Sequence, residues 1–247
     1  MNIGGIYKTK HYGDLEVVSY SGSTKVTVRF LSSGYETQAY KHNILKGAVK
    51  DPYYPKHEGR GFLGEGKYKA KCEGKNTKPY SVWRNILTRC YREEGLKNLT
   101  YKDCSVCTSW LNFQNFARWY EKECEGLSEN KTYQVDKDLL CKGNKVYSPE
   151  TCTLITQEIN SLIAYEQASD STLPVGVYLN NGVVDKYYAM CRVEGVNTYL
   201  GQYNSPDEAS LAYTRQKEST IKIQAIKAYN KGELSKEARD ALLEWKV

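Results

Sequence analysis

Residues 135–160, with the sequence VDKDLLCKGNKVYSPETCTLITQEIN, have the layout of a centre that acts on phosphodiesters. Asp136 and Asp138 lead into a short loop ending at Asn144, and after a tight YSPETC turn an amphipathic run closes on Asn160. A one-metal nuclease needs such a layout, because a divalent cation stabilises the leaving oxygen during hydrolysis. Hard cations of this kind prefer oxygen ligands.

The residue between the two aspartates determines whether this stretch has a general base for hydrolysis. It is Lys137, whereas a one-metal nuclease normally has a histidine beside the first aspartate. A lysine starts with a pKa of about 10.4, and the two flanking carboxylates raise that pKa further, away from use as a base at neutral pH. The three histidines, His11, His42 and His57, all lie outside residues 81–165. The sequence leaves open whether the chain cuts DNA or only holds it.

The helices and strands of residues 81–165 must position this stretch. Helical spacing near residues 81–95 predicts a helix whose buried stripe consists of Trp83, Ile86, Leu87 and Cys90. A second helix is predicted over residues 109–126, and its inward stripe consists of Trp110, Phe113, Phe116, Ala117 and Tyr120. Residues 135–160 then follow as strand, loop, strand and helix.

The N-terminal part divides into two segments of different character. Residues 1–50 alternate apolar and polar side chains around turns, which predicts short strands in a meander or a small barrel. This module could dock nucleic acid or protein, or act as a stabilising cap. Residues 51–80 are rich in Gly, Pro, Lys and Tyr without periodicity, which predicts a linker or a basic arm that tracks phosphates.

The C-terminal part, residues 174–247, has the pattern of a small sheet followed by helices. Three strands are predicted in VGVYLN, KYYAMCRVEG and NTYLGQY. A helix then starts after Ser205, an N-cap that is followed by Pro206 and two acidic residues. A last helix is predicted after the cap Ser235. The whole chain is therefore expected to be an α+β protein with an N-terminal β module, a middle ββα-containing domain and a C-terminal three-stranded antiparallel sheet plus helix.

Composition fits a globular protein that can bind nucleic acid. The chain has 247 residues, enough for one large or two to three small domains, and a formal charge of +6. Its 22 tyrosines against four phenylalanines suit wet surfaces, where a ring packs and a hydroxyl bonds. We find neither a signal peptide nor an apolar run long enough to cross a membrane, and the eight cysteines do not form a small disulfide scaffold, so we expect a cytoplasmic protein.

Two family resemblances are visible. The middle segment resembles the HNH endonuclease-type proteins common in bacteriophages and mobile introns, through VWRNILTRCY, YKDCSVCTSWLNFQNFARW and YQVDKDLLCKGNKVYSPETCTLITQEIN. These stretches cover residues 80–162, about a third of the chain. Residues 176–213 resemble the APETALA/ethylene-response-factor DNA-binding domain, through GV, YLGQY and DEASLAY at the expected spacing.

The HNH resemblance implies a metal centre in a ββα unit. Carried over to this chain, Asp136 would be the first ligand of Mg²⁺ or Mn²⁺ and Asn144 or Asn160 the second, while Asp138 could add an oxygen. Asp136, Lys137 and Asn160 are then the candidate catalytic residues. With Lys137 in the histidine position, the resemblance implies either an altered active site or a scaffold in which the lysine contacts phosphate as a point charge.

Four cysteines of the middle segment raise a second metal hypothesis. Some HNH-type proteins hold a structural zinc ion, and here the ligands would be Cys104, Cys107, Cys141 and Cys152. The alternative is that these are buried free thiols that pack as small apolar side chains.

The APETALA-type resemblance implies a DNA-reading face on the C-terminal sheet. Strand alternation turns Tyr187, Ala189, Cys191 and Val193 toward the helix. In the resembling family the opposite face lies in the major groove, where arginines and aromatic residues read bases and grip phosphates. The expected DNA-contacting residues of this chain are Tyr178, Lys186, Tyr188, Arg192, Asn197 and Tyr199.

The sequence alone leaves three functions open. The first is a double-stranded-DNA-binding protein of phage type whose HNH-like centre is degenerate. The second is an active Mg²⁺-dependent endonuclease or nickase of homing type. The third is an interaction protein that blocks a host enzyme or defence system with the same folds, in the host cytoplasm. The sequence predicts no oligomeric state.

Overall fold

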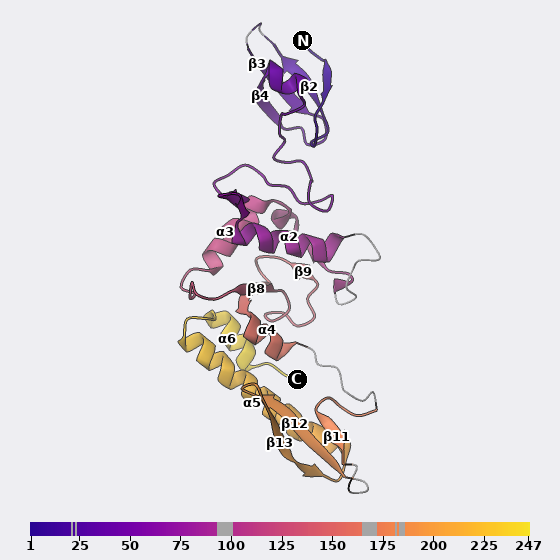
Figure 1. The fold of residues 1–247 in the computed structure, drawn as a ribbon, viewed down its shortest axis with the longest axis vertical. Coiled ribbons are helices and arrows are strands. Elements are labelled where there is room, and N and C mark those ends of the chain that lie inside the picture. Colours follow the sequence, from indigo (N-terminus) through magenta and orange to yellow (C-terminus); the bar gives the residue numbers. More distant parts are fainter. Residues whose placement is uncertain (21, 23, 93–100, 165–171, 181, 183–185) are drawn as a thin grey trace. The chain divides into compact units, whose positions relative to one another are not determined.

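The computed structural model of this chain describes residues 1–20, 22, 24–92, 101–164, 172–180, 182 and 186–247. These residues form helices and several small separate sheets (Figure 1), which confirms the α+β class. The chain divides into two compact units. The first comprises Met1–Lys122 and Lys145–Glu150, and the second comprises Glu123–Asn144 and Thr151–Val247. The division thus falls inside residues 81–165, which the sequence predicted as one domain.

The first unit begins with a four-stranded antiparallel meander in the order β1-β2-β3-β4. Its strands are β1 (Ile6–Lys8), β2 (Asp14–Ser19), β3 (Lys25–Phe30) and β4 (Glu36–Tyr40), followed by the short helix α1 (Lys41–Leu45). Alternation buries one side chain in two, including Leu15, Val17, Val26, Val28 and Phe30. The meander is confirmed, but the sheet does not close into a barrel within the described residues, because β1 and β4 each pair on one side only.

Residues 51–80 do not form the linker or extended arm that their composition predicted. The segment is fixed to the following helices by backbone bonds, since the Phe62 N–H donates to the Leu111 carbonyl at 2.9 Å and the Phe62 carbonyl accepts from the Phe113 N–H at 2.9 Å. Gly61 lies against Trp83 so closely that a Cβ atom there would come within 2.9 Å of the indole ring. Toward its end the segment forms a small hairpin of β5 (Lys71–Cys72) and β6 (Lys75–Asn76).

The helices of the first unit enclose an aromatic core. They are α2 (Lys78–Tyr91), the 3₁₀ helix η2 (Thr108–Leu111) and α3 (Phe113–Glu123). Both predicted stripes are buried. The first predicted helix is confirmed as far as Tyr91, and its residues 93–95 lie outside the described residues. The second, predicted as one helix over residues 109–126, is interrupted at Asn112, whose extended backbone separates η2 from α3. The parallel pair of β7 (Ser105–Val106) and β9 (Val146–Tyr147) attaches residues 145–150 to this unit.

The second unit begins with the strands that carry Asp136. β8 (Tyr133–Asp136) pairs antiparallel with β10 (Thr153–Thr156), and α4 (Gln157–Ile163) follows directly. The hydroxyl of Thr156 caps α4 by accepting the Ile159 N–H at 3.3 Å. The two strands and the helix of the expected ββα unit are therefore present, with β9 of the intervening segment assigned to the first unit.

A three-stranded antiparallel sheet and two helices complete the second unit, as the sequence predicted. The sheet consists of β11 (Val177–Leu179), β12 (Tyr187–Val193) and β13 (Val196–Tyr203), and the helices are α5 (Pro206–Asn230) and α6 (Lys236–Leu243). Ser205 and Ser235 cap these helices through their hydroxyls.

The long helix α5 joins two parts of the second unit's core. Its first turns pack on the sheet through Ala209, beside Val177 and Ala189. Its last turns pack against α4, α6 and the loop after β8, in an apolar cluster that consists of Leu139, Ile155, Ile159, Ile221, Ala225, Ala228, Leu234, Ala238 and Leu242. None of the helices in the described ranges is long and apolar enough to cross a membrane.

Candidate functional site

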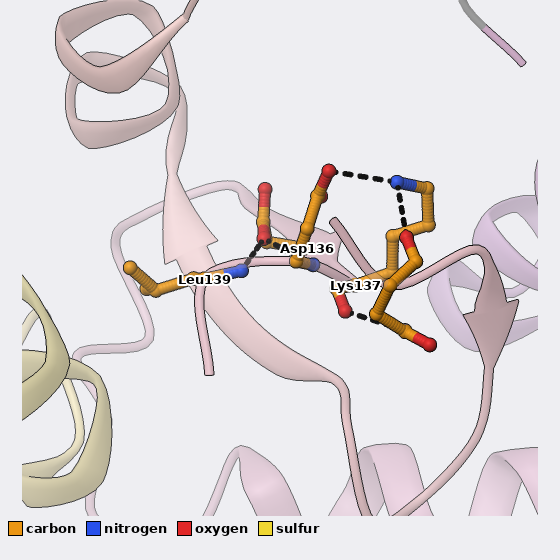
Figure 2. A network of polar contacts seen from close by, with 5 residues as sticks. Asp136, Lys137 and Leu139 are labelled. Atoms are coloured by element: carbon orange, nitrogen blue, oxygen red, sulfur yellow. Dashed lines mark hydrogen bonds and ion pairs between the residues drawn. The ribbon is translucent and has the colours of Figure 1, made fainter. Parts of the chain in front are cut away.

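Asp136 stands at the end of β8 and turns the chain that follows. Its Oδ1 accepts the backbone N–H groups of Asp138 at 3.0 Å and Leu139 at 2.7 Å (Figure 2). This turn inserts Leu139 into the core shared by α4, α5 and α6, where it is 5% exposed. Burial raises the pKa of Asp136 above its ordinary value and outweighs the Leu139 N–H, which lowers it. The carboxylate is thus part of the local fold, whatever else it does.

Lys137 is buried and holds the loop together. Its side chain is 8% exposed, and its Nζ donates to Asp138 Oδ2 at 2.8 Å and to the Asn144 carbonyl at 3.0 Å (Figure 2). In return, Asn144 Nδ2 donates to the Lys137 carbonyl at 2.7 Å. A charge removed from water needs acceptors, and Lys137 has two of them within its own loop. Contact between this ammonium and phosphate stays a prediction.

Asn160 lies on α4 and contacts Gln134 of β8, which is two residues before Asp136 in the sequence. Its Nδ2 donates to Gln134 Oε1 at 3.0 Å. Gln134 and Asp136 share a face of β8, since alternate residues of a strand point the same way. The structure therefore places Asn160 beside Gln134, whereas Asp138 and Asn144 are joined through Lys137. Gln134 is a polar neighbour that the sequence did not single out.

Two of the oxygen atoms expected to bind Mg²⁺ or Mn²⁺ already have partners within the loop. Oδ1 of Asp136 already accepts two N–H groups, and Oδ2 of Asp138 already faces an ammonium. Lys137 thus supplies a positive charge beside these carboxylates. Within the described ranges, no group of three or more His, Cys, Asp and Glu residues gathers closely enough to hold a metal.

The four cysteines of the zinc hypothesis are divided between the two units. Cys104 and Cys107 belong to the first unit, and Cys141 and Cys152 to the second. None of these four thiols is joined in a disulfide in the part of the chain that the structure describes; Cys104 and Cys152 are buried, Cys107 is partly exposed and Cys141 is exposed. A zinc site remains a prediction from the sequence.

The outward face of the C-terminal sheet carries a row of tyrosines, one from each strand. Tyr178 of β11 stands directly opposite Tyr188 of β12, and their rings stack with centroids 5.2 Å apart. Tyr199 of β13 continues the row, with its ring centroid 6.2 Å from that of Tyr188. Tyr199 is 58% exposed. The row is therefore a solvent-facing aromatic surface and not part of a core.

No family model, curated protein or solved structure matches the chain.

Polar and cationic side chains border the tyrosine row. The exposed Arg192 stands opposite Asn197, and its Nε donates to the Gly195 carbonyl at 3.2 Å. Lys186 precedes β12 and donates to the side chain of Asn204. All six residues that the sequence assigned to DNA contact thus lie on one face, while Ala189 and Cys191 are buried against α5 as alternation predicted. We call this surface the tyrosine face.

A β-bulge extends the tyrosine face by one residue that the sequence analysis missed. The pairing of β12 with β13 shifts between Ala189 and Met190, which leaves Leu200 as the extra residue of β13. The shift places Gln202 opposite Tyr188, on the outward face. Gly201 stands beside the bulge with a φ of 126°. A glycine inside an otherwise regular strand is the signal that could have predicted this irregularity.

Proposed function

We propose that the chain is a double-stranded-DNA-binding protein of phage type that binds DNA through the tyrosine face. We further propose that its HNH-like centre is a degenerate scaffold that does not cut DNA. The observation that carries the proposal is the continuous row Tyr178–Tyr188–Tyr199 with Arg192 and Lys186 beside it on a solvent-exposed sheet. The family resemblances of the sequence point to the same ligand.

The chemistry of the tyrosine face suits a duplex. Arginine and lysine neutralise phosphates, and tyrosine hydroxyls donate hydrogen bonds to phosphate and sugar oxygens. Arg192 and Asn197, which stand opposite one another, are the residue types that pair in a bidentate manner with guanine and adenine edges in the major groove. The three strands contain no Asp or Glu that would repel the phosphates.

The chemistry of the Asp136 loop favours a protein that binds DNA and does not cleave it. General base catalysis needs a group that accepts a proton near neutral pH, and the residue in the histidine position is a buried ammonium paired with Asp138. The chain's histidines, His11, His42 and His57, all belong to the first unit. The loop instead anchors Leu139 in the core on which α5 rests, and α5 in turn supports the tyrosine face.

Binding is tested by fluorescence anisotropy with labelled duplex DNA over a series of salt concentrations. We expect Arg192→Gln to weaken binding to the best sequence about 5- to 150-fold, since a base contact contributes roughly 1–3 kcal/mol. Arg215→Gln is the matched control, because Arg215 is exposed on α5. Binding by wild type that Arg192→Gln and Tyr199→Ala leave unchanged would overturn the assignment of the face.

Cleavage is tested on supercoiled plasmid with Mg²⁺ or Mn²⁺. We expect no relaxed or linear product from wild type. Nicking that is present in wild type and lost in Asp136→Asn would establish an active nuclease. A wild-type protein that binds no duplex even at low salt, but captures a host enzyme through Tyr199, would favour the third function.

A further inference from the structure

The hairpin of residues 67–78 is built as a rigid basic projection of the first unit. Its strands β5 and β6 pair Lys71 with Asn76 and Cys72 with Lys75. The two residues between them, Glu73 and Gly74, have φ values of 49° and 79°. Positive φ at both central positions defines the type I′ turn, whose twist matches that of the two strands. The tip therefore has a defined conformation.

The base of this hairpin is clamped to the helices. The Thr77 N–H donates to the Ala70 carbonyl at 3.0 Å, and the Thr77 hydroxyl donates to the Lys69 carbonyl at 2.9 Å. Gln114 of α3, which is 6% exposed, accepts the Tyr68 N–H at 3.0 Å and donates to the Tyr68 carbonyl at 2.9 Å. A ligand that binds the hairpin need not order the backbone first, which lowers the entropic cost of binding.

The charge of the hairpin is concentrated and largely uncompensated. Five lysines and one glutamate give residues 67–78 a formal charge of +4, against +6 for the whole chain. Lys67 is neutralised by Glu121 at 3.0 Å. Lys69, Lys71 and Lys75 are exposed and form no ion pair with any residue that the structure describes.

We propose that Lys69, Lys71 and Lys75 form a second, sequence-independent contact with the phosphates of duplex DNA. The cations of the hairpin are all lysines, which act as point charges, and the hairpin lacks the arginine fork that reads a base in a bidentate manner. It also exposes no large apolar side chain that would enter a membrane or a protein core. The inference rests on the proposed function for the identity of the polyanion, but it concerns a different unit and different residues.

The test compares two double variants of the full chain. Lys71→Gln with Lys75→Gln removes the tip charges, and Lys46→Gln with Lys50→Gln is the charge-matched control on exposed residues of the same unit. Each phosphate contact contributes about 0.9 to the slope of log K against log salt, so the tip variant should lose about 1.8 of slope. The loss should be equal on matched and scrambled duplexes. Lys71→Arg with Lys75→Arg should keep the slope.

The outcomes separate the two proposals. A tip variant with the wild-type slope overturns the hairpin contact, even if Arg192→Gln weakens binding. A reduced slope supports the hairpin contact, even if Arg192→Gln has no effect and the tyrosine face fails. Duplex DNA should also protect Lys69, Lys71 and Lys75 from acetylation, as read by mass spectrometry. Equal acetylation with and without bound DNA would likewise overturn it.

Discussion

Replacing Asp136 in two ways separates the shape of its side chain from its charge. Asp136→Asn keeps an oxygen that can accept the N–H groups of Asp138 and Leu139, which now lie 3.0 Å and 2.7 Å from Oδ1. Asp136→Ala removes that oxygen and leaves both donors without it. A buried donor left without an acceptor costs about 1–3 kcal/mol, and we take the lower part of that range, about 1–2 kcal/mol, for each of the two donors of this partly exposed loop. We therefore expect Asp136→Ala to destabilise the loop by about 2–4 kcal/mol and Asp136→Asn to destabilise it little or not at all.

The pH dependence of the two variants follows from the raised pKa of Asp136. Because burial raises this pKa in the folded state, the folded protein binds more protons than the unfolded chain between the unfolded and folded values. The stability that protonated Asp136 contributes is fully present below the unfolded pKa and is lost as pH rises through the folded pKa. Asp136→Asn has no such loss, so its stability relative to wild type should rise over that window.

The assay is amide hydrogen exchange of the Leu139 N–H, which reports on this loop alone. A local loss of about 2–4 kcal/mol in Asp136→Ala corresponds to exchange that is faster by roughly 30- to 700-fold, while Asp136→Asn should exchange nearly as wild type does. If Asp136→Asn exchanges as fast as Asp136→Ala at neutral pH, the negative charge itself holds the loop. The structural interpretation of Asp136 would then be refuted.

Two further predictions concern Lys137 and His57. Lys137→Met removes the ammonium from Asp138 and from the Asn144 carbonyl, so the free energy of unfolding measured in urea should fall by about 1–3 kcal/mol. The control Lys236→Met, at an exposed position, should lower it by less than about 0.5 kcal/mol. Equal effects of the two substitutions would refute the role of Lys137 in holding the loop. Burial, and after it the charges of Arg84 and Lys56, lower the pKa of His57 from 6.5. The stability that neutral His57 contributes is therefore fully present above pH 6.5 and is lost as the pH falls through the folded pKa. His57→Gln should flatten this slope in denaturation on either side of pH 6.5, and an unchanged slope would argue against it.

Local periodicity predicted the regular elements and one face of the candidate site. Alternation of side chains depends only on neighbouring residues, so it placed Ala189 and Cys191 inward, while the resemblance to the APETALA-type domain supplied the six expected DNA-contacting residues on the opposite face. Helix caps are equally local, and Ser205 and Ser235 cap as their positions indicated. The bulge that brings Gln202 onto the tyrosine face depends on how two strands pair, and only the structure shows it.

Tertiary contacts decided what composition and charge could not. Residues 51–80 have no periodicity, yet Gln114, far along the chain, fixes their backbone at Leu63 and Tyr68. The spacing of Asp136, Asp138 and Asn144 suggested ligands around a metal, whereas the fold turns Lys137 inward to bind two of them. A sequence shows which charges are near one another along the chain. Burial, which sets whether a charge meets water, phosphate or a neighbouring carbonyl, arises only when distant segments pack.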